Sequence, residues 1–130
     1  MAARRRPAIV SREVAASRVE RDLLGELAVP AGKLYGIRTV RALRNLSFSG
    51  RVLGAYPRYV RALAMVKKAA ARANREARVI DSRIASAIEA ACDEILISGH
   101  RLEFPVDVLG GGGSIAINMN VNEAIANLAN

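Results

Sequence analysis

The stretch from Pro57 to Ile80 constrains the fold more than any other part of the sequence, because it has the pattern of one long helix. Proline suits the first position of a helix, and residues 58–80 contain no Gly and no further Pro. Largely apolar side chains recur there at helical spacing, namely Val60, Leu63, Ala64, Lys67, Ala70, Ala71 and Asn74. The sequence therefore predicts a helix that buries this stripe and, through its many alanines, lets another helix approach closely.

A second helix is predicted directly afterwards, over residues 82–98. Asp81 or Ser82 can cap its start and Gly99 can close its end. Its apolar stripe comprises Ile84, Ile88, Ala91, Cys92 and Ile95. Two helices joined by so short a link are expected to pack antiparallel. Its acidic residues, Glu89, Asp93 and Glu94, are expected to be solvated carboxylates and not an acid–base pair.

The segment before this pair is predicted to be irregular or β-like. Gly25, Pro30, Gly32 and Gly36 interrupt it too often for a long helix. We expect short extended pieces with five side chains packed inward: Leu23, Leu24, Val29, Leu34 and Tyr35. Arg18, Glu20 and Asp22 are expected to form structural ion pairs. A short helix follows at 39–45, with Thr39 as its cap, and residues 48–54 are expected to form a loop.

Four consecutive glycines, Gly110 to Gly113, mark the candidate binding loop. A glycine run exposes backbone N–H groups, and the helix expected to open near Asn118 or Asn120 adds unpaired N–H donors. Together they can bind a small carboxylate, although a flexible connector remains the alternative reading. The asparagines at 118, 120 and 122 are expected to cap this helix, whose apolar face looks unfinished at Asn130.

The overall composition favours one mainly helical domain. The chain has 130 residues, 52% of them hydrophobic and only 4% aromatic, with a net charge of +8. Residues 1–17, with Arg4, Arg5 and Arg6, are predicted to form a basic flexible arm. Most other basic residues are mixed with acids and lack nearby aromatics, which disfavours nucleic-acid binding. A basic helical module using 4–6 and 58–78 nevertheless stays an alternative.

Single-residue chemistry adds little to this picture. Cys92 is the only cysteine and is expected in the core, and His100 is the only histidine and is expected in a loop, so no metal site is predicted. No apolar run is long enough to span a membrane, and the N-terminus lacks the pattern of a secretory signal. The expected location is therefore cytoplasmic.

Six segments between about Arg18 and Asn130 occur in a recognisable order: RVERDLLGELAVP, LYGIRTVRALRN, MVKKAAARAN, IASAIEAACDEILISG, FPVDV and NMNVNEAIAN. Together they resemble the N-terminal domain of aspartate ammonia-lyases, in the fumarase/aspartase superfamily. Class II fumarases are similar too, and FPVDV, DLLG and VKKAAA look closer to the aspartase pattern. The expected fold is thus mainly α, with an irregular or β-like opening, an antiparallel helix pair, a truncated terminal helix, and 18–130 as the domain.

The resemblance implies the reversible, cofactor-free elimination of ammonia from L-aspartate to give fumarate. In the family, a serine on a mobile loop removes a proton beside a carboxylate, and hydrogen bonds hold the resulting aci-carboxylate. Family members are homotetramers in which three subunits build each active site. The implied partners here are aspartate or fumarate and copies of the same chain, with no nucleic acid or membrane.

The loop departs from the family pattern. The family threonine that binds substrate falls on Ile115, which cannot donate a hydrogen bond, and the following serine falls on Ala116, which leaves Ser114 as the nearest hydroxyl. Losing such a donor to a carboxylate costs about 1.5–3 kcal/mol. The candidate substrate-binding residues are Gly111, Gly112, Gly113, Ser114, Ile115 and Asn118.

The chain also ends before the segments that carry the family's catalytic residues. No catalytic residue is therefore assigned, and His100 does not match the family histidine. We expect this polypeptide to be the front portion of a lyase, inactive alone and marginally stable or associating. The alternatives are a class II fumarase fragment, the basic binding module, and a scaffold domain that has lost its chemistry.

Overall fold

The computed structural model describes residues 16–110 and 115–130. Within these ranges the chain is mainly helical, as predicted, with one antiparallel two-stranded sheet. The elements are β1 (Ser17–Asp22), β2 (Gly25–Pro30), α1 (Ile37–Asn45), α2 (Pro57–Glu76), α3 (Ser82–Ser98) and α4 (Ile115–Ala129), with 3-10 turns η1 (Leu53–Ala55) and η2 (Arg101–Glu103). The predicted arm lies outside the described residues up to position 15, and its last residue, Ser17, begins β1.

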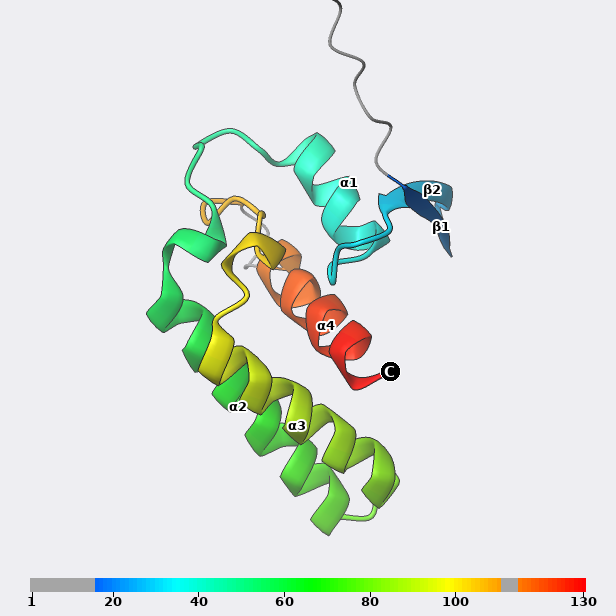
Figure 1. Ribbon diagram of the computed structural model, residues 1–130, viewed down its shortest axis with the longest axis vertical. Helices are drawn as coiled ribbons and strands as arrows, with labels where there is room; N and C mark the ends of the chain where they lie inside the picture. Colours follow the sequence, from blue (N-terminus) through cyan, green and yellow to red (C-terminus); the bar gives the residue numbers. More distant parts are fainter. Residues whose placement is uncertain (1–15, 111–114) are drawn as a thin grey trace, which may run out of the picture.

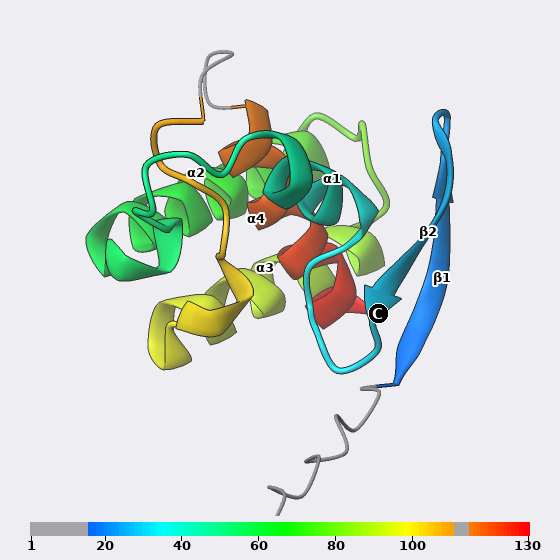
Figure 2. The same ribbon diagram turned by 90° about the horizontal axis from the view of Figure 1, so that it is seen from above.

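Each of the helices α1 to α4 packs against at least one other. Figure 1 shows α2 and α3 as an antiparallel pair, with α4 along α3 and α1 on the opposite side of α4. The β-hairpin lies at the outer edge beside α1, and Figure 2 shows it standing apart from α2 and α3. Because α4 contacts both α1 and α3, it joins the two halves of the molecule.

The ends of the helix pair agree with the sequence signals. Pro57 is the first residue of α2, and the Asp81 carboxylate accepts a hydrogen bond from the Arg83 N–H at the start of α3. Gly99 ends α3 with a φ of 75°, a left-handed conformation that glycine adopts at little cost. These local signals are sufficient to place both helices.

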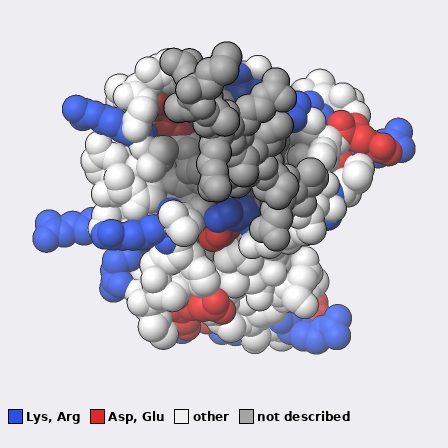
Figure 3. Space-filling model, turned by 45° about the horizontal axis from the view of Figure 1, so that its top comes forward, with Lys and Arg blue, Asp and Glu red and all other residues white. Residues whose placement is uncertain are grey.

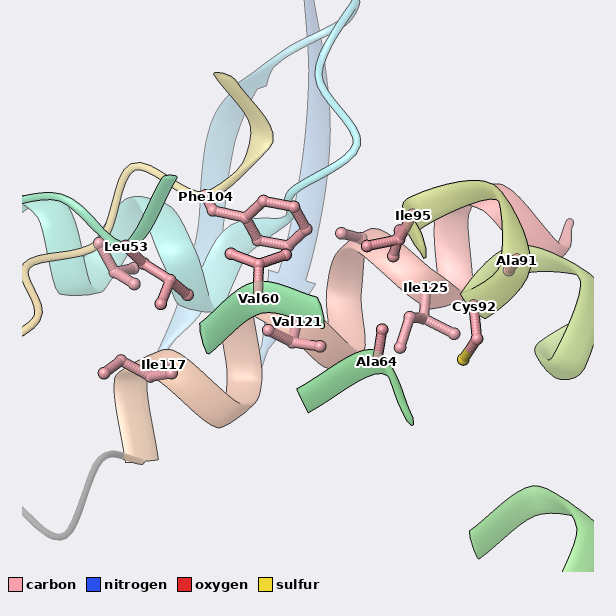
Figure 4. Close-up of a cluster of buried hydrophobic side chains, with 12 residues drawn as sticks. Leu53, Val60, Ala64, Ala91, Cys92, Ile95, Phe104, Ile117, Val121 and Ile125 are labelled. Carbon is pink, nitrogen blue, oxygen red and sulfur yellow. The ribbon is translucent and has the colours of Figure 1, made fainter. Parts of the chain in front are cut away.

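The core lies where α2, α3 and α4 meet the segment 104–106. Figure 4 shows the Phe104 ring beside Val60, and Cys92 near Ile125. Cys92 is fully buried, as predicted, and this burial raises the pKa of its thiol. Ile84 was expected in the α3 stripe but is 51% exposed, because it lines an open cavity between α3 and the end of α4.

In the β-hairpin, two of the five side chains that were expected to pack inward are exposed instead. Asp22 pairs with Gly25, so Leu23 and Leu24 form the tight turn at its tip. A hairpin tip has few neighbours, and these side chains are 101% and 79% exposed. The other three follow the prediction: Val29 and Tyr35 are buried with Ile37, and Leu34 packs against the main core.

Both shorter helices begin earlier than predicted. α1 starts at Ile37, with Thr39 buried inside its first turn, so Thr39 is not its cap. α4 starts at Ile115, three residues before Asn118 and five before Asn120, and the apolar run 115–117 belongs to its first turn. No helix in 16–110 or 115–130 has the length and apolar character needed to cross a lipid bilayer.

Candidate functional site

The candidate site lies between α1 and the start of α4, at Gly110 and Ile115. Gly111 to Ser114 lie outside the described residues, but Gly110 and Ile115 on either side of them are placed. Both line a groove of about 470 Å³, together with Asp22, Leu24, Arg38, Arg41, Ala42, Asn45, Leu46, Ala116 and Met119. Its volume lies within the roughly 300–1,000 Å³ typical of small-molecule sites. The ends of the predicted loop therefore border a cavity.

A strand-like pairing positions the start of the loop. The segment 104–108 runs beside 51–54, with hydrogen bonds from Leu53 N to Val106 O and from Val108 N to Arg51 O, both 2.8 Å long. Gly54 allows this close approach, because a Cβ there would lie 2.1 Å from the Arg101 carbonyl oxygen. Residues 52–54, predicted as loop, thus act as a support for the FPVDV segment.

Asp107 then fixes the backbone immediately before the glycines. Its carboxylate accepts hydrogen bonds from the Ser49 hydroxyl (2.6 Å) and from the N–H groups of Ser49, Phe48 and Leu109 (2.6, 3.2 and 2.8 Å). These donors, the Ser49 hydroxyl foremost, lower the pKa of Asp107 to about 2. A carboxylate with four donors is a fixed structural anchor and has no free proton to exchange near neutral pH.

A paired guanidinium forms one wall of the groove. Arg41 donates to both carboxylate oxygens of Asp22 at 2.9 and 2.8 Å, and to the Gly25 carbonyl at 3.1 Å. The Arg41 hydrogen bond lowers the pKa of Asp22, and the same contact raises the pKa of Arg41. Arg18 likewise bonds Glu20 at 2.8 Å. The predicted ion pairing of Arg18, Glu20 and Asp22 is confirmed, with Arg41 as the unforeseen partner of Asp22.

Glu123 of α4 holds the start of α1 in place beside the groove. Its carboxylate accepts from the N–H groups of Gly36, Arg38 and Thr39 at 2.9, 2.8 and 3.1 Å, and from the Thr39 hydroxyl at 2.7 Å. A carboxylate at a helix N-terminus satisfies its unpaired donors and complements the helix dipole. The cap of α1 is thus supplied from 84 residues further along the chain.

Asn118 is not among the residues that line the groove. Its side-chain oxygen accepts a hydrogen bond from Lys67 of α2 at 2.5 Å. Asn120 is fully buried and donates to the Glu103 carbonyl at 2.8 Å. Neither these two nor Asn122 caps α4, because all three lie after its first turn and Asn118 and Asn120 bind other elements. Ala116 and Met119 face the groove instead.

The groove residues of α1 were not predicted from the sequence. Arg38, Arg41 and Asn45 recur at intervals of three and four, the spacing that places side chains on one face of a helix. That polar spacing within LYGIRTVRALRN was the available signal. Ile115, at the expected threonine position, is 66% exposed and lies at the groove.

Away from the groove, Glu89 was wrongly expected to be solvated. Its side chain is only 12% exposed, because Arg72 of α2 donates a hydrogen bond to Oε2 at 2.7 Å and Arg75 forms an ion pair with Oε1 at 2.8 Å. The Arg72 hydrogen bond lowers the pKa of Glu89. Asp93 and Glu94 are about half exposed, as expected. His100 follows α3 in a connecting segment, where Nε2 lies 2.8 Å from Glu94.

Comparisons with known proteins place this arrangement in a family. A family model described as Lyase matches residues 25–130. The aspartate ammonia-lyase of Escherichia coli K12 is 48% identical over 112 residues, which cover 85% of this chain and 23% of that enzyme. The class II fumarate hydratase of Halobacterium salinarum is 49% identical over 112 residues, covering 86% and 23%. The chain thus spans about a quarter of the length of these curated relatives.

Solved structures agree with the sequence comparison. A native fumarate lyase:delta crystallin from Brucella melitensis has a TM-score of 0.85 and 47% identity, covering 88% of this chain and 26% of that one. A class II fumarase from Schistosoma mansoni has a TM-score of 0.82 and 34% identity, covering 88% and 24%. The chain therefore belongs to the lyase family that includes aspartate ammonia-lyases and class II fumarases.

Proposed function

We propose that this chain supplies the dicarboxylate-binding portion of an aspartate ammonia-lyase, which eliminates ammonia from L-aspartate to give fumarate. The observation that carries the proposal is the groove, because the two placed ends of the glycine loop, Gly110 and Ile115, line it together with Arg38 and Arg41. Arginine and free backbone N–H groups are the donors that bind carboxylates best. The Escherichia coli relative supports aspartate as the substrate.

In this proposal the described residues bind and orient substrate and do not transfer protons. Asp107 fixes the start of the loop, Glu123 fixes α1, and the first N–H groups of α4 lie beside the groove at Ile115 and Ala116. These groups are held by the fold before any ligand arrives, so they can stabilise a developing negative charge without rearranging. None of these described residues is proposed as the proton-removing base, and the proposed assembly is a cytoplasmic homotetramer.

The test is a chimera in which this chain replaces the matching 112 residues of the Escherichia coli enzyme. We expect fumarate to form from L-aspartate, detected by its ultraviolet absorbance, more slowly than with the parent enzyme. The Ile115→Thr chimera restores the lost donor and should regain about tenfold or more in rate. The parent enzyme and the oligomeric state of each chimera serve as controls.

A class II fumarase is the second candidate, because the Halobacterium salinarum relative is as similar as the ammonia-lyase. The same chimeras are therefore assayed with L-malate. If the chimeras convert L-malate but not L-aspartate, the chain is a portion of a class II fumarase and not of an ammonia-lyase. A correctly assembled Ile115→Thr chimera that is inactive on both substrates would contradict a substrate-binding role for the groove.

A further inference from the structure

The groove has an unbalanced charge. Arg41 is neutralised by its two hydrogen bonds to Asp22, so this pair contributes little net charge. Arg38 also lines the groove, is exposed, and forms no ion pair within residues 16–110 and 115–130. The Arg41 hydrogen bond is the main cause of the lowered pKa of Asp22, and the charge of Arg38 adds to it. The groove therefore carries one uncompensated positive charge beside a fixed, neutral pair.

The rest of the groove surface is mainly apolar. Six of its lining residues are Leu24, Ala42, Leu46, Ile115, Ala116 and Met119. Leu24 and Ile115 are 79% and 66% exposed, so their side chains are available to a ligand. An exposed apolar surface gains free energy when a ligand covers it, at about 25 cal/mol per Å². A purely polar dicarboxylate would leave this surface uncovered.

We propose that the groove is selective for a carboxylate that carries an apolar substituent, with Arg38 as its charged contact and Ile115 as the specificity-determining contact. This inference deepens the proposed function, since it names the class of acid bound at the same site. At position 115 this chain places a branched hydrocarbon at the groove, with no hydroxyl to donate a hydrogen bond. The guanidinium of Arg38 then supplies carboxylate recognition that Ile115 cannot give.

The side chain of Arg38 can be replaced without disturbing the fold. Its backbone N–H is bonded to Glu123 at 2.8 Å, which fixes its position on α1, and no side-chain hydrogen bond to a described residue would be lost on its replacement. Arg44 lies on the same helix, is also exposed, and does not line the groove. Arg44 therefore provides a matched control for the loss of one positive charge from α1.

The test is a calorimetric titration of the 130-residue chain with fumarate and with methylfumarate at low ionic strength. The extra methyl group should tighten binding about fourfold. Arg38→Gln should weaken the binding of both acids about tenfold, while Arg44→Gln leaves both unchanged. Added salt should weaken binding to the unsubstituted chain more than to the Arg38→Gln variant.

The Ile115→Thr variant separates the apolar contact from the charged one. It should lose the preference for methylfumarate and keep its dependence on Arg38. Absence of binding by the folded chain, equal effects of the two arginine substitutions, or equal affinity for the two acids would overturn the inference. Because binding is read on this chain and catalysis on the chimera, either proposal can fail while the other survives.

Discussion

At the scale of single residues, the acidic side chains serve the fold more than the chemistry. Asp107 and Glu123 each accept several hydrogen bonds, and Glu89 pairs with two arginines, in contacts that mostly reach another part of the chain. Such contacts link segments that are far apart in sequence, so no local sequence pattern predicts them. This is why Glu89 was wrongly expected to be solvated and why Asp107 and Glu123 were not singled out.

Asp107 predicts a defined pH dependence of stability. Its pKa is about 2 in the folded chain against an ordinary value of 3.8, so the unfolded chain binds the proton more readily. The stabilisation that the hydrogen-bonded Asp107 carboxylate gives the folded chain is fully present above pH 3.8 and is lost as the pH falls through about 2. Urea unfolding of the wild type and Asp107→Asn should therefore show a stability difference that shrinks across this interval. A constant difference from neutral pH to pH 2 would contradict the anchoring role.

At the scale of elements, the sequence predicts the α2–α3 pair well and the flanking elements less well. Pro57, Asp81 and Gly99 are local signals that act at the helix ends themselves, so their positions could be read directly. The starts of α1 and α4 depend on partners elsewhere, namely Glu123 for α1 and the packing of residue 117 for α4. The predicted starts were therefore two residues too late for α1 and three or five too late for α4.

The cap supplied by Glu123 can be measured through the stability of α1. Glu123→Ala leaves three N–H groups and a hydroxyl without their acceptor, and should lower the free energy of unfolding by about 3 kcal/mol. Glu76→Ala, at the exposed end of α2, is the control and should change it by less than about 0.5 kcal/mol. Chemical denaturation followed by circular dichroism compares the two. Equal losses would show that Glu123 is not the cap of α1.

At the scale of the whole molecule, charged side chains on the face seen in Figure 3 are dispersed, and apolar side chains of the helix pair are exposed. Figure 3 shows Lys and Arg side chains in separate groups, with acidic groups and uncharged surface between them. Several large apolar side chains on α2 and α3 are exposed, including Met65, Val66 and Ile97. The expectation that the isolated chain associates stays a prediction, and this surface supports it.

The candidate site was only partly predictable from sequence. The glycine run marked where the groove would lie, since Gly110 and Ile115 do line it. The sequence could not show that α1 folds back to face α4, because that contact joins residues more than 80 positions apart. Arg38 and Arg41 therefore emerged only from the fold, and Asn118 proved to bond Lys67.

The central claim is that a dicarboxylate binds in the groove at the ends of the glycine loop. Backbone amide chemical shifts of the isotopically labelled chain, recorded during titration with fumarate, test it most directly. We expect shifts at Gly110, Ile115, Ala116 and Arg38, all at the groove. The larger cavity at Ile84 and Ala129, of about 570 Å³, should show none. Shifts at that cavity alone, or no shifts at the groove, would contradict the account.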